Sequence, residues 1–458
     1  MTNIRISVLT AAALSTTLAA QWAQVTPATA PTARSGAGMC YDGSRLVMFG
    51  GSTGFSASNQ TWTYDGTTWQ QLAPTNSPTG KQGMELIHDP IRGVIVMYGS
   101  LNTSIFGGAS VDQTWEFDGT TWTQAFPTTT PGGLGIYCGA YDLGRQKVVI
   151  YGGEADNFFP IASADTWEYD GTNWTLVTTV GSPGPIERGS MCYFPPLGKI
   201  VMFGGIDPQI GGNNTTWTYD GTTWAALAIS GPSPAARFGA GLAYDPVRNV
   251  LVLAGGGDPM TGSGFTDTWE FNGTSWTQQP TSTAGQAAAA MAFHTGVRKV
   301  VRFGGMNPMT GAQNANTLHY GASSRAFGTG CPGSNGTPAL AAADAPRLGG
   351  SQTLTLTNLN TSAAFAVMVI GLSNTTSAFG ALPLPLAAYG MPGCTAYVST
   401  EGTTLIGASA GTAQFVSNLP NNLAFLGLPL YHQCLSLDAA ANAGGLTTSN
   451  ALASIVGH

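Results

Sequence analysis

The stretch TWTYDGTTW, residues 61–69, returns four times along the chain with small edits. The later copies are TWEFDGTTW (114–122), TWEYDGTNW (166–174), TWTYDGTTW (216–224) and TWEFNGTSW (268–276). The first tryptophan of each copy stands at 62, 115, 167, 217 and 269, which gives a period of 50 to 53 residues. A period of this length, with several short strands in each unit, is typical of the blades of a β-propeller.

Each copy predicts a β-hairpin. Asp-Gly is the strongest two-residue signal for a type I′ turn, in which both central residues need a positive φ. With Asp65 and Gly66 as a two-residue turn, Trp62 and Trp69 are expected to lie directly opposite each other. The repeat therefore predicts structural hairpins whose tryptophans are buried between strands, rather than a set of catalytic residues.

Two further strands precede each hairpin. An apolar strand ending in glycine occurs six times: RLVMFGG (45–51), GVIVMYGS (93–100), KVVIYGG (147–153), KIVMFGG (199–205), NVLVLAGGG (249–257) and KVVRFGG (299–305). A shorter strand before it ends near Tyr-Asp, as in GMCYD (38–42). The recurring aspartates are expected to start the turn between these two strands: Asp42, Asp89, Asp142 and Asp245.

The sixth unit has three strands, ending in NTLHYG (316–321), and no clear fourth. At the other end of the chain, QWAQV (21–25) resembles the fourth strands of the other units. Trp22 is followed by Gly36 at the same spacing that separates Trp69 from Gly83. We therefore expect residues 21–25 to complete the last blade, with Trp22 in a strand paired with residues 317–320. The predicted fold class is all-β, a six-bladed propeller closed by the N-terminal strand of the mature chain.

Four features recur in order and resemble Kelch repeats of the galactose-oxidase-like type: a base opening strand one, a double glycine ending strand two, an aromatic in strand three and a tryptophan in strand four. The resemblance covers about residues 21–322, although unit two has Gly99-Ser100 and unit six lacks both tryptophans. Since strand one is the innermost strand of such a blade, the resemblance implies that the opening bases ring the channel mouth. These bases are Arg34, Lys81, Arg188 and Arg237.

A galactose-oxidase-like copper site would need two histidines and two tyrosines, one of them cross-linked to a cysteine. No such set can be placed among the five histidines of this chain. No nucleophile elbow, phosphate-binding loop or HExxH-type zinc motif occurs either. We therefore assign no catalytic residue, no metal and no cofactor.

Beyond Tyr320 the repeat stops, and from Cys331 onward there is no Trp and no Lys. Alternating segments such as QTLTLTN (352–358) and FAVMVIGL (365–372) predict a small β-sandwich-like domain. The expected division is residues 21–325 for the propeller and 326–458 for this domain. Cys331 and Cys394 each stand beside Pro-Gly and are the expected disulfide pair, although the sequence alone leaves the connectivity open.

Residues 1–20 hold one basic residue, Arg5, and an apolar run that ends in small residues, which predicts a secretory signal peptide cut after Ala19 or Ala20. The alternative is a disordered Ala/Thr-rich start. No later apolar run reaches the roughly 18 residues of a membrane helix. With 9% charged residues and a net charge of −7, nothing marks a nucleic-acid surface. We expect a monomer that is secreted or held at the cell envelope.

The loops between strands two and three differ in every unit and share a rim with the starts of strand one, so function is expected there. Asp207, Asp258 and Asn307 occupy equivalent loop positions and can instead start Asx-Pro turns or pair with the opening bases, which would then hold the loops in place with nothing bound. The predicted ligand-binding set is the four opening bases inside a collar of Asp156, Asn157, Phe158, Phe159, Asp207, Asp258 and Asn307.

Three functions stay open at this point. The first is a non-catalytic binding propeller that holds a glycan or a protein, with the bases favouring an anionic or hydroxyl-rich partner. The second is a carbohydrate-active enzyme using two rim carboxylates about 5–10 Å apart, drawn from Glu154, Asp156, Asp207 and Asp258. The third is a cell-surface structural or adhesion protein in which the C-terminal domain matters more than the propeller.

Overall fold

The computed structural model describes residues 21–54, 56–101, 110–154, 162–279, 283–321, 325–342, 346, 349–422 and 428–456. The expected signal peptide lies outside these residues. By its internal contacts the described chain divides into one unit of residues 21–321 and a second that begins at residue 322. The boundary lies before the expected residue 325, because strand β27 (Arg325–Phe327) already pairs with β38 (Leu446–Ile455) of the second unit.

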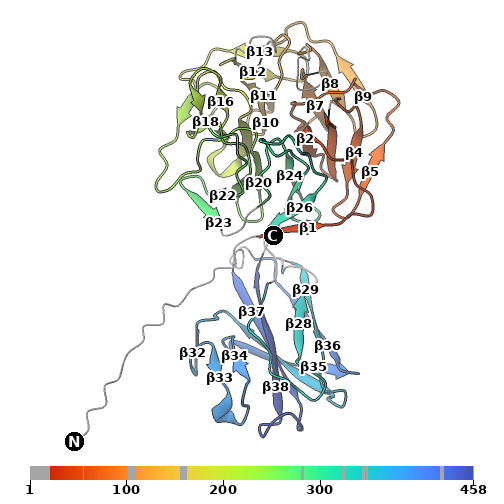
Figure 1. Ribbon diagram of the computed structural model, residues 1–458, viewed down its shortest axis with the longest axis vertical. Helices are drawn as coiled ribbons and strands as arrows, with labels where there is room; N and C mark the ends of the chain where they lie inside the picture. The colour runs from red at the N-terminus through yellow and green to blue at the C-terminus, as the bar shows by residue number, and fades with distance from the viewer. Residues whose placement is uncertain are drawn as a thin grey trace, which may run out of the picture. The chain divides into compact units, whose positions relative to one another are not determined.

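The first unit is a six-bladed β-propeller in which every blade is a four-stranded antiparallel sheet. Figure 1 shows β2, β10, β20 and β24 around the axis and β5, β9, β13 and β23 at the periphery. The strands of blades 1 to 3 are β2 (Ser35–Tyr41), β3 (Leu46–Ser52), β4 (Thr61–Tyr64) and β5 (Trp69–Leu72); β6 (Ile87–Asp89), β7 (Val94–Tyr98), β8 (Thr114–Phe117) and β9 (Trp122–Ala125); and β10 (Cys138–Asp142), β11 (Lys147–Tyr151), β12 (Thr166–Tyr169) and β13 (Trp174–Val177).

Blades 4 to 6 follow the same plan. Their strands are β14 (Ser190–Phe194), β15 (Lys199–Phe203), β18 (Thr216–Tyr219) and β19 (Trp224–Ala226); β20 (Gly241–Asp245), β21 (Val250–Ala254), β22 (Thr268–Phe271) and β23 (Trp276–Gln279); and β24 (Ala290–His294), β25 (Lys299–Phe303), β26 (Thr317–Gly321) and β1 (Gln21–Val25). Blade 4 also carries a short loop hairpin, β16 (Ile206–Asp207) with β17 (Gly211–Gly212), and the 3₁₀ turn η1 (Pro195–Leu197).

The ring closes as the sequence predicted. Strand β1 pairs antiparallel with β26, and Trp22 lies opposite Tyr320. The first strand of the described chain is therefore the outermost strand of the last blade, which confirms the six-bladed architecture and joins both ends of the propeller in one sheet.

The predicted register of the hairpins is wrong. Trp69 lies opposite Tyr64, whereas Trp62 lies opposite Gln71. The turn therefore contains four residues, from Asp65 to Thr68, rather than two. The same pairing recurs in the other hairpins: Phe117 with Trp122, Tyr169 with Trp174, Tyr219 with Trp224 and Phe271 with Trp276.

The aspartate of the turn explains the longer loop. Oδ1 of Asp65 accepts hydrogen bonds from the backbone N–H groups of Thr67 and Thr68 and from the Thr67 hydroxyl. Gly66 has a φ of 100°, and it is the only turn residue with a positive φ, so the type I′ geometry does not form. A side chain that caps two amides favours this four-residue loop.

The tryptophan of strand four joins each blade to the one before it. Trp69 packs on Tyr64 with 4.8 Å between ring centroids, and its indole N–H donates to the hydroxyl of Thr317 in blade 6. The same bond occurs at all six junctions, at 2.9–3.0 Å: Trp22 to Thr268, Trp69 to Thr317, Trp122 to Thr61, Trp174 to Thr114, Trp224 to Thr166 and Trp276 to Thr216. Five of these six indoles are buried, which confirms their structural role.

The strand-one aspartates start turns, as predicted, and also build ion-pair networks. Asp89 accepts backbone N–H bonds from Ile91 and Arg92, and its second oxygen lies 2.7 Å from Arg92 Nε. Arg92 reaches Glu116, which also accepts the hydroxyl of Tyr169 from blade 3. The same network recurs with Asp142, Arg145, Glu168 and Tyr219, and with Asp245, Arg248, Glu270 and Tyr320. We call the propeller face that carries these networks the base face.

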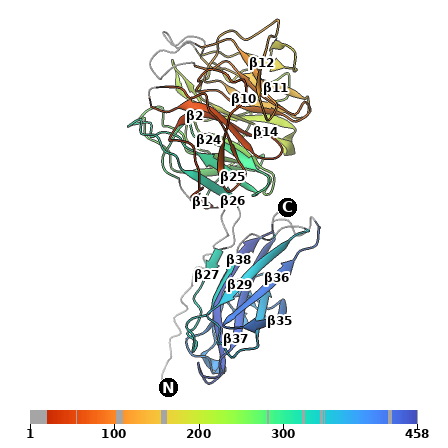
Figure 2. The same cartoon turned by 90° about the vertical axis from the view of Figure 1, so that its right-hand side faces the viewer.

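The second unit contains one eight-stranded antiparallel sheet, in the order β27-β38-β37-β30-β35-β36-β29-β28. Figure 2 shows its long strands β37 and β38 running alongside each other. The strands not yet given are β28 (Ala339–Ala342), β29 (Ser351–Thr357), β30 (Phe365–Gly371), β35 (Gly402–Ser409), β36 (Thr412–Asn418) and β37 (Pro429–Leu437). Two short strand pairs lie outside this sheet. The first is β31 (Thr376–Ser377) with β32 (Gly380–Ala381). The second is β33 (Leu384–Pro385) with β34 (Thr395–Ala396), which stand on either side of the 3₁₀ turn η2 (Ala387–Tyr389) in the sequence.

This sheet curls into a barrel-like body. Leu340 of β28 and Leu452 of β38, far apart in the strand order, belong to one buried apolar cluster. The Asn450 side chain closes the gap, since it accepts the N–H of Leu340 and donates to its carbonyl. The unit is all-β as predicted, and its two packed halves are parts of one continuous sheet.

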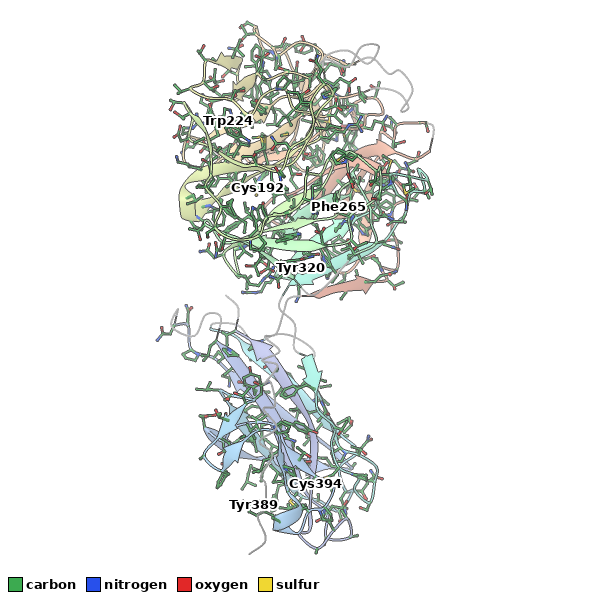
Figure 3. The ribbon with its side chains drawn as sticks, turned by 60° about the vertical axis from the view of Figure 1, so that its left-hand side comes forward. Cys192, Trp224, Phe265, Tyr320, Tyr389 and Cys394 are labelled. Carbon is green, nitrogen blue, oxygen red and sulfur yellow. A yellow bond between two sulfur atoms is a disulfide. The ribbon has the colours of Figure 1, made fainter. Side chains whose placement is uncertain are left out.

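Cys331 and Cys394 form a disulfide, with their Cα atoms 4.7 Å apart, and Cys434 is a buried free thiol. This is the pair that the sequence favoured. Figure 3 shows Cys394 close to Tyr389 in the second unit. The two described helices, η1 and η2, have three residues each, and no helix in the described ranges has the length and apolarity to cross a membrane.

Candidate functional site

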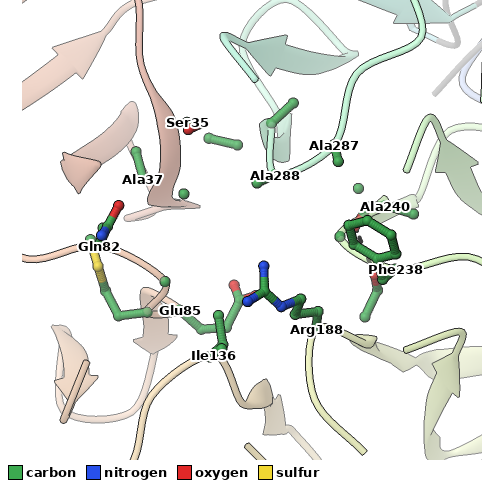
Figure 4. Close-up of a pocket in the computed structure, with 18 of the residues that line it drawn as sticks. Ser35, Ala37, Gln82, Glu85, Ile136, Arg188, Phe238, Ala240, Ala287 and Ala288 are labelled. Atoms are coloured by element: carbon green, nitrogen blue, oxygen red, sulfur yellow. Dashed lines mark hydrogen bonds between the residues drawn. The ribbon is translucent and has the colours of Figure 1, made fainter. Parts of the chain in front are cut away.

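A cavity of about 260 Å³ lies on the propeller axis. It is lined by residues where the innermost strands begin, such as Ser35 and Gln82, and by residues just beyond the ends of the second strands, such as Leu101 and Met306. Figure 4 looks into it, with lining side chains from several blades around the opening. The cavity therefore opens on the face that bears the long loops between strands two and three, which we call the loop face.

Six backbone hydrogen bonds form a closed ring around this cavity. In each blade one residue donates its N–H to the carbonyl of the equivalent residue in the preceding blade, at 2.7–2.9 Å. All six have a φ between 49° and 67°, although β-branched Ile136 in particular resists that conformation. The ring residues are Gly36, Gly83, Ile136, Arg188, Gly239 and Ala288.

The ring shows that the four opening bases are not equivalent. Arg34, Lys81 and Arg237 each stand two residues before a ring residue, whereas Arg188 is itself a ring residue. The position in blade 4 that matches the other three bases is occupied by Ile186.

Three of the four bases are buried and do not ring the channel mouth, so that expectation is wrong. Arg34 donates to the Gly50 carbonyl and to Gln60, and burial lowers its pKa to about 10. Lys81 donates to Gln113, and burial lowers its pKa to about 8. Their exposed fractions are 1% and 0%. Both side chains fasten the start of strand one to the approach to strand three of the same blade.

Arg237 does the same in blade 5. It makes two bonds to the Asp267 carboxylate, at 2.6 and 2.9 Å, and its guanidinium lies 4.1 Å from the ring centroid of Phe265. Gln60, Gln113 and Asp267 all stand one residue before strand three, so the pairing was readable as a recurring polar residue there.

Arg188 is the one opening base that reaches the cavity. Its side chain is 38% exposed, and Nε lies 3.2 Å from Oε1 of Glu187. Figure 4 shows its guanidinium pointing into the opening. The positive charge at the mouth is thus that of a single arginine already paired with a carboxylate.

The predicted collar residues Asp207, Asp258 and Asn307 form turns. Their side-chain oxygens accept the backbone N–H groups two and three residues further along the chain, in three equivalent Asx turns. They do not belong to the cavity lining. The other collar residues, Asp156, Asn157, Phe158 and Phe159, lie outside the described residues.

These turns present apolar side chains that the sequence analysis missed. Ile210, Met260 and Met309 are 87%, 94% and 70% exposed. Each follows the Asx residue of its turn by two or three positions, in blades 4, 5 and 6. The loops of blades 4 and 5 touch, since a Cβ added to Gly212 would come within 2.4 Å of Pro259. We call these three residues the apolar tips.

The sequence analysis also missed Glu85, whose signal was a charged residue in the apolar segment MELIHD (84–89). It lines the cavity two residues beyond the ring residue Gly83. Within the described part of the chain its carboxylate has neither a hydrogen-bond donor nor an ion-pair partner, and burial raises its pKa to about 8.

The charge of the Glu85 carboxylate raises the pKa of cysteine thiols in three other blades. Burial, followed by the charges of Asp42 and Glu85, raises the pKa of the Cys40 thiol in blade 1. Burial and then Glu85 likewise raise the pKa of Cys138 in blade 3. In blade 4 burial raises the pKa of Cys192 to about 12, with Glu85 adding to the rise. A side chain that acts on blades 1, 3 and 4 at once lies close to the propeller axis.

The cavity is acidic rather than basic. Glu85 and Glu154 line it. Arg188 is the one cationic residue among the described lining residues, and it pairs with Glu187. The remaining wall is largely alanine, glycine and methionine. No three His, Cys, Asp or Glu side chains within the described ranges gather closely enough to hold a metal ion.

Comparison with models of known protein families and with curated proteins finds no match for this chain.

Proposed function

We propose that the propeller is a binding module that holds a partner protein on its loop face. A propeller of this kind suits a binding or non-catalytic scaffold role, and we infer that its blades are of the Kelch type, from the order of their recurring features and their four-stranded sheets. The base face and the blade junctions are occupied by the networks and indole bonds described above, whereas the loop face has an open cavity and side chains without a packing role.

The apolar tips are the observation that carries this proposal. Single exposed apolar residues are common on protein surfaces. Here, however, Ile210, Met260 and Met309 stand on equivalent turns of three successive blades, all at least 70% exposed. Asx bonds hold each turn in shape, so the tips need little ordering on binding. Methionine is adaptable and frequent at protein-binding surfaces, so the tips favour a protein over a glycan.

The carboxylates support binding over hydrolysis. Asp207 and Asp258, two of the four candidates for acid and base, already hold the backbone of their own turns. Asp156 lies outside the described residues, and Glu154 lies in the cavity wall. The pair of facing rim carboxylates that glycoside hydrolysis requires is therefore not assembled by Asp207 and Asp258.

Export belongs to the same proposal. The pattern of residues 1–20 supports a signal peptide, and the disulfide between Cys331 and Cys394 suits an oxidising compartment. Expression in the source cells followed by N-terminal sequencing of the extracellular protein is expected to find Ala20 or Gln21 first. A cell-associated protein that starts at Met1 would contradict export.

Site-specific cross-linking tests the binding face. A photo-reactive phenylalanine analogue replaces Met260 in one variant and Ile91, which is 61% exposed in the Asp89 turn of the base face, in the control. After illumination with extracellular and envelope proteins of the source cells, we expect a discrete protein adduct at position 260 only. Excess unlabelled wild-type protein is expected to compete for the partner and suppress this adduct. Excess of an unlabelled variant with I210S, M260S and M309S is expected to leave the adduct unchanged. Equal adducts at both positions, or none at 260, would reject the proposal.

A further inference from the structure

The axial cavity holds a carboxylate that the fold itself does not neutralise. Withdrawing a charged group from water without a partner is costly, yet Glu85, which is partly buried, lines the cavity with no ion pair or hydrogen-bond donor for its carboxylate within the described residues. The other five blades carry no acid at the equivalent strand position, two after the ring, so the repeat does not demand one there: they have Gly38, Cys138, Ser190, Gly241 and Ala290.

Arg188 does not serve as the missing partner. It stands at the ring, whereas Glu85 stands two residues beyond the ring, which corresponds to about 6–7 Å along an extended chain. The Arg188 guanidinium is paired with Glu187 instead. An anion entering past Arg188 would meet Glu154 and Glu85, so the charges of the cavity select a cation at Glu85.

The walls around Glu85 are apolar and adaptable. Met39, Met84, Met191 and Met291 line the cavity together with alanines and glycines of the ring region. A volume of about 260 Å³ is smaller than the roughly 300–1,000 Å³ of pockets for drug-sized ligands. A slender group with an aliphatic stem fits such walls better than a bulky or strongly hydrated one.

We propose that the axial cavity is a receptor for one protonated amine on an aliphatic stem, with the ammonium at the Glu85 carboxylate and the stem along the methionines. The source of the amine is either a lysine side chain of a partner protein or a free alkylamine. The lysine source rests on the proposed protein-binding function, whereas the free amine does not.

The protonation of Glu85 links amine binding to pH. Four titratable groups interact electrostatically with its carboxylate: Tyr137, Cys40, Cys138 and Cys192. The charged groups nearer the mouth are Arg188, Glu154 and Glu187. Burial raises the pKa of Tyr137 and of the three thiols, so these groups stay neutral between pH 6 and 9. With a pKa of about 8, Glu85 is mostly neutral in the empty cavity at pH 6 and must release its proton to bind an ammonium. Amine affinity therefore rises with pH, about tenfold per unit below pH 8, and levels off above it.

Titration calorimetry on the full chain tests the inference. The probes are n-butylamine and Nα-acetyl-lysine methylamide, with 1-butanol and the norleucine analogue as neutral counterparts of the same stem. We expect the amines to bind at least tenfold more tightly than their counterparts, with the rise in affinity up to pH 8. E85Q is expected to remove both the preference and the pH dependence. D118N is the matched control, since Asn272 shows that an amide keeps the equivalent hairpin turn on the base face, and it is expected to bind as wild type.

Each outcome decides the matter. Binding of butylamine and of the lysine probe supports a general amine receptor, and binding of the lysine probe alone assigns the cavity to a partner's lysine. Equal affinity for amines and neutral counterparts, unchanged binding by E85Q, or no amine binding at pH 8 would overturn the inference. If amines fail to bind while the cross-link at position 260 persists, the cavity inference falls and the proposed binding face stands.

Discussion

The two faces of the propeller treat charge in opposite ways. On the base face Arg92, Arg145 and Arg248 each bridge two carboxylates, and a tyrosine from the next blade completes the network. On the loop face the bases are buried within a blade or paired at the mouth, and Glu85 has no partner in the described chain. Tight hairpins repeat the same residues on the base face, while the loops on the other face differ in every blade. The base face therefore serves stability, and the loop face is the one on which we propose that a partner binds.

The largest expected effect comes from breaking a base-face network. Arg145→Met leaves Asp142 and Glu168, whose side chains are 3% and 12% exposed, without their cation. Removing one partner of a buried ion pair costs about 3–4 kcal/mol of the free energy of unfolding. Arg188→Met, on the loop face, is expected to cost less than about 1 kcal/mol. Urea unfolding followed by tryptophan fluorescence reports the propeller selectively, because no tryptophan lies beyond Trp276. Similar losses for both variants would remove the distinction between the faces.

The second effect uses Glu85 to sharpen the same contrast. Its pKa is about 8 when folded, against 4.5 when unfolded, so between these values the folded state holds a proton that the unfolded state has lost. Stability is therefore fully present below pH 4.5 and is lost as pH rises through 8. The full linkage is about 5 kcal/mol, and water entering the open cavity reduces it to about 2–3 kcal/mol.

Urea unfolding at pH 4.5 and 9.0 measures this linkage. We expect E85Q to lose about 2–3 kcal/mol less than wild type between the two pH values, with D258N behaving as wild type. A wild type and an E85Q variant with the same pH dependence would show that Glu85 is ionised or solvated throughout.

Recurrence in the sequence made the base face and the blades predictable, and its absence made the cavity unpredictable. Trp22 could be placed beside Tyr320 because QWAQV repeats a fourth strand. The hairpin register was predicted wrongly because the Asp65 side chain accepts two backbone N–H groups, which lengthens the turn to four residues. The Asp-Gly pair alone does not reveal this longer turn. Strand-one bases face either the axis or the body of their blade, and only the partners at Gln60 and Gln113 decide between them.

Glu85 illustrates the limit most clearly. It occurs once, so no repeat marks it, and its meaning depends on the approach of strands from blades 1, 3 and 4. The apolar tips were hidden for a different reason. Exposure of Met260 follows from the direction of its turn, whereas an apolar residue in a loop sequence reads equally well as buried.

A smaller effect is expected at the junction of blades 6 and 1, where the base face uses histidines. His319 stands at the position of Glu116 and Glu168, and its Nε2 lies 2.9 Å from the Tyr64 hydroxyl. Burial, followed by the charges of Lys299 and His294, lowers the pKa of His319 to about 4. The unfolded chain thus takes up a proton first, so stability is present above pH 6.5 and is lost as pH falls toward 4.

We expect this junction to cost about 1–2 kcal/mol of stability over that range, a value reduced for the partial exposure of the ring. His319→Gln is expected to remove that part of the acid dependence, and D118N is the control on the same face, since the pKa of Asp118 is held below its ordinary value by hydrogen bonds from Thr120 and Thr121. Tryptophan-monitored unfolding at pH 7.0 and 4.5 gives the difference. An acid dependence that survives H319Q unchanged would place the sensitive group elsewhere on the propeller.

The smallest effect concerns the Asx turns of the loop face. Asp258→Ala removes the acceptor for the N–H groups of Met260 and Thr261, and Asp258→Asn keeps it, as Asn307 does in blade 6. Loss of such a capping bond loosens the turn, and because the turn is exposed the cost falls on local opening rather than on global unfolding. Hydrogen exchange is therefore expected to speed up at Met260 and Thr261 in D258A, about two- to fivefold, with the exchange of strands β20 and β21 unchanged. Since a looser turn must be ordered again on binding, D258A is also expected to weaken the cross-link from position 260, whereas D258N preserves it. Faster exchange with an undiminished cross-link would mean that the apolar tips bind without being held in place by their turns.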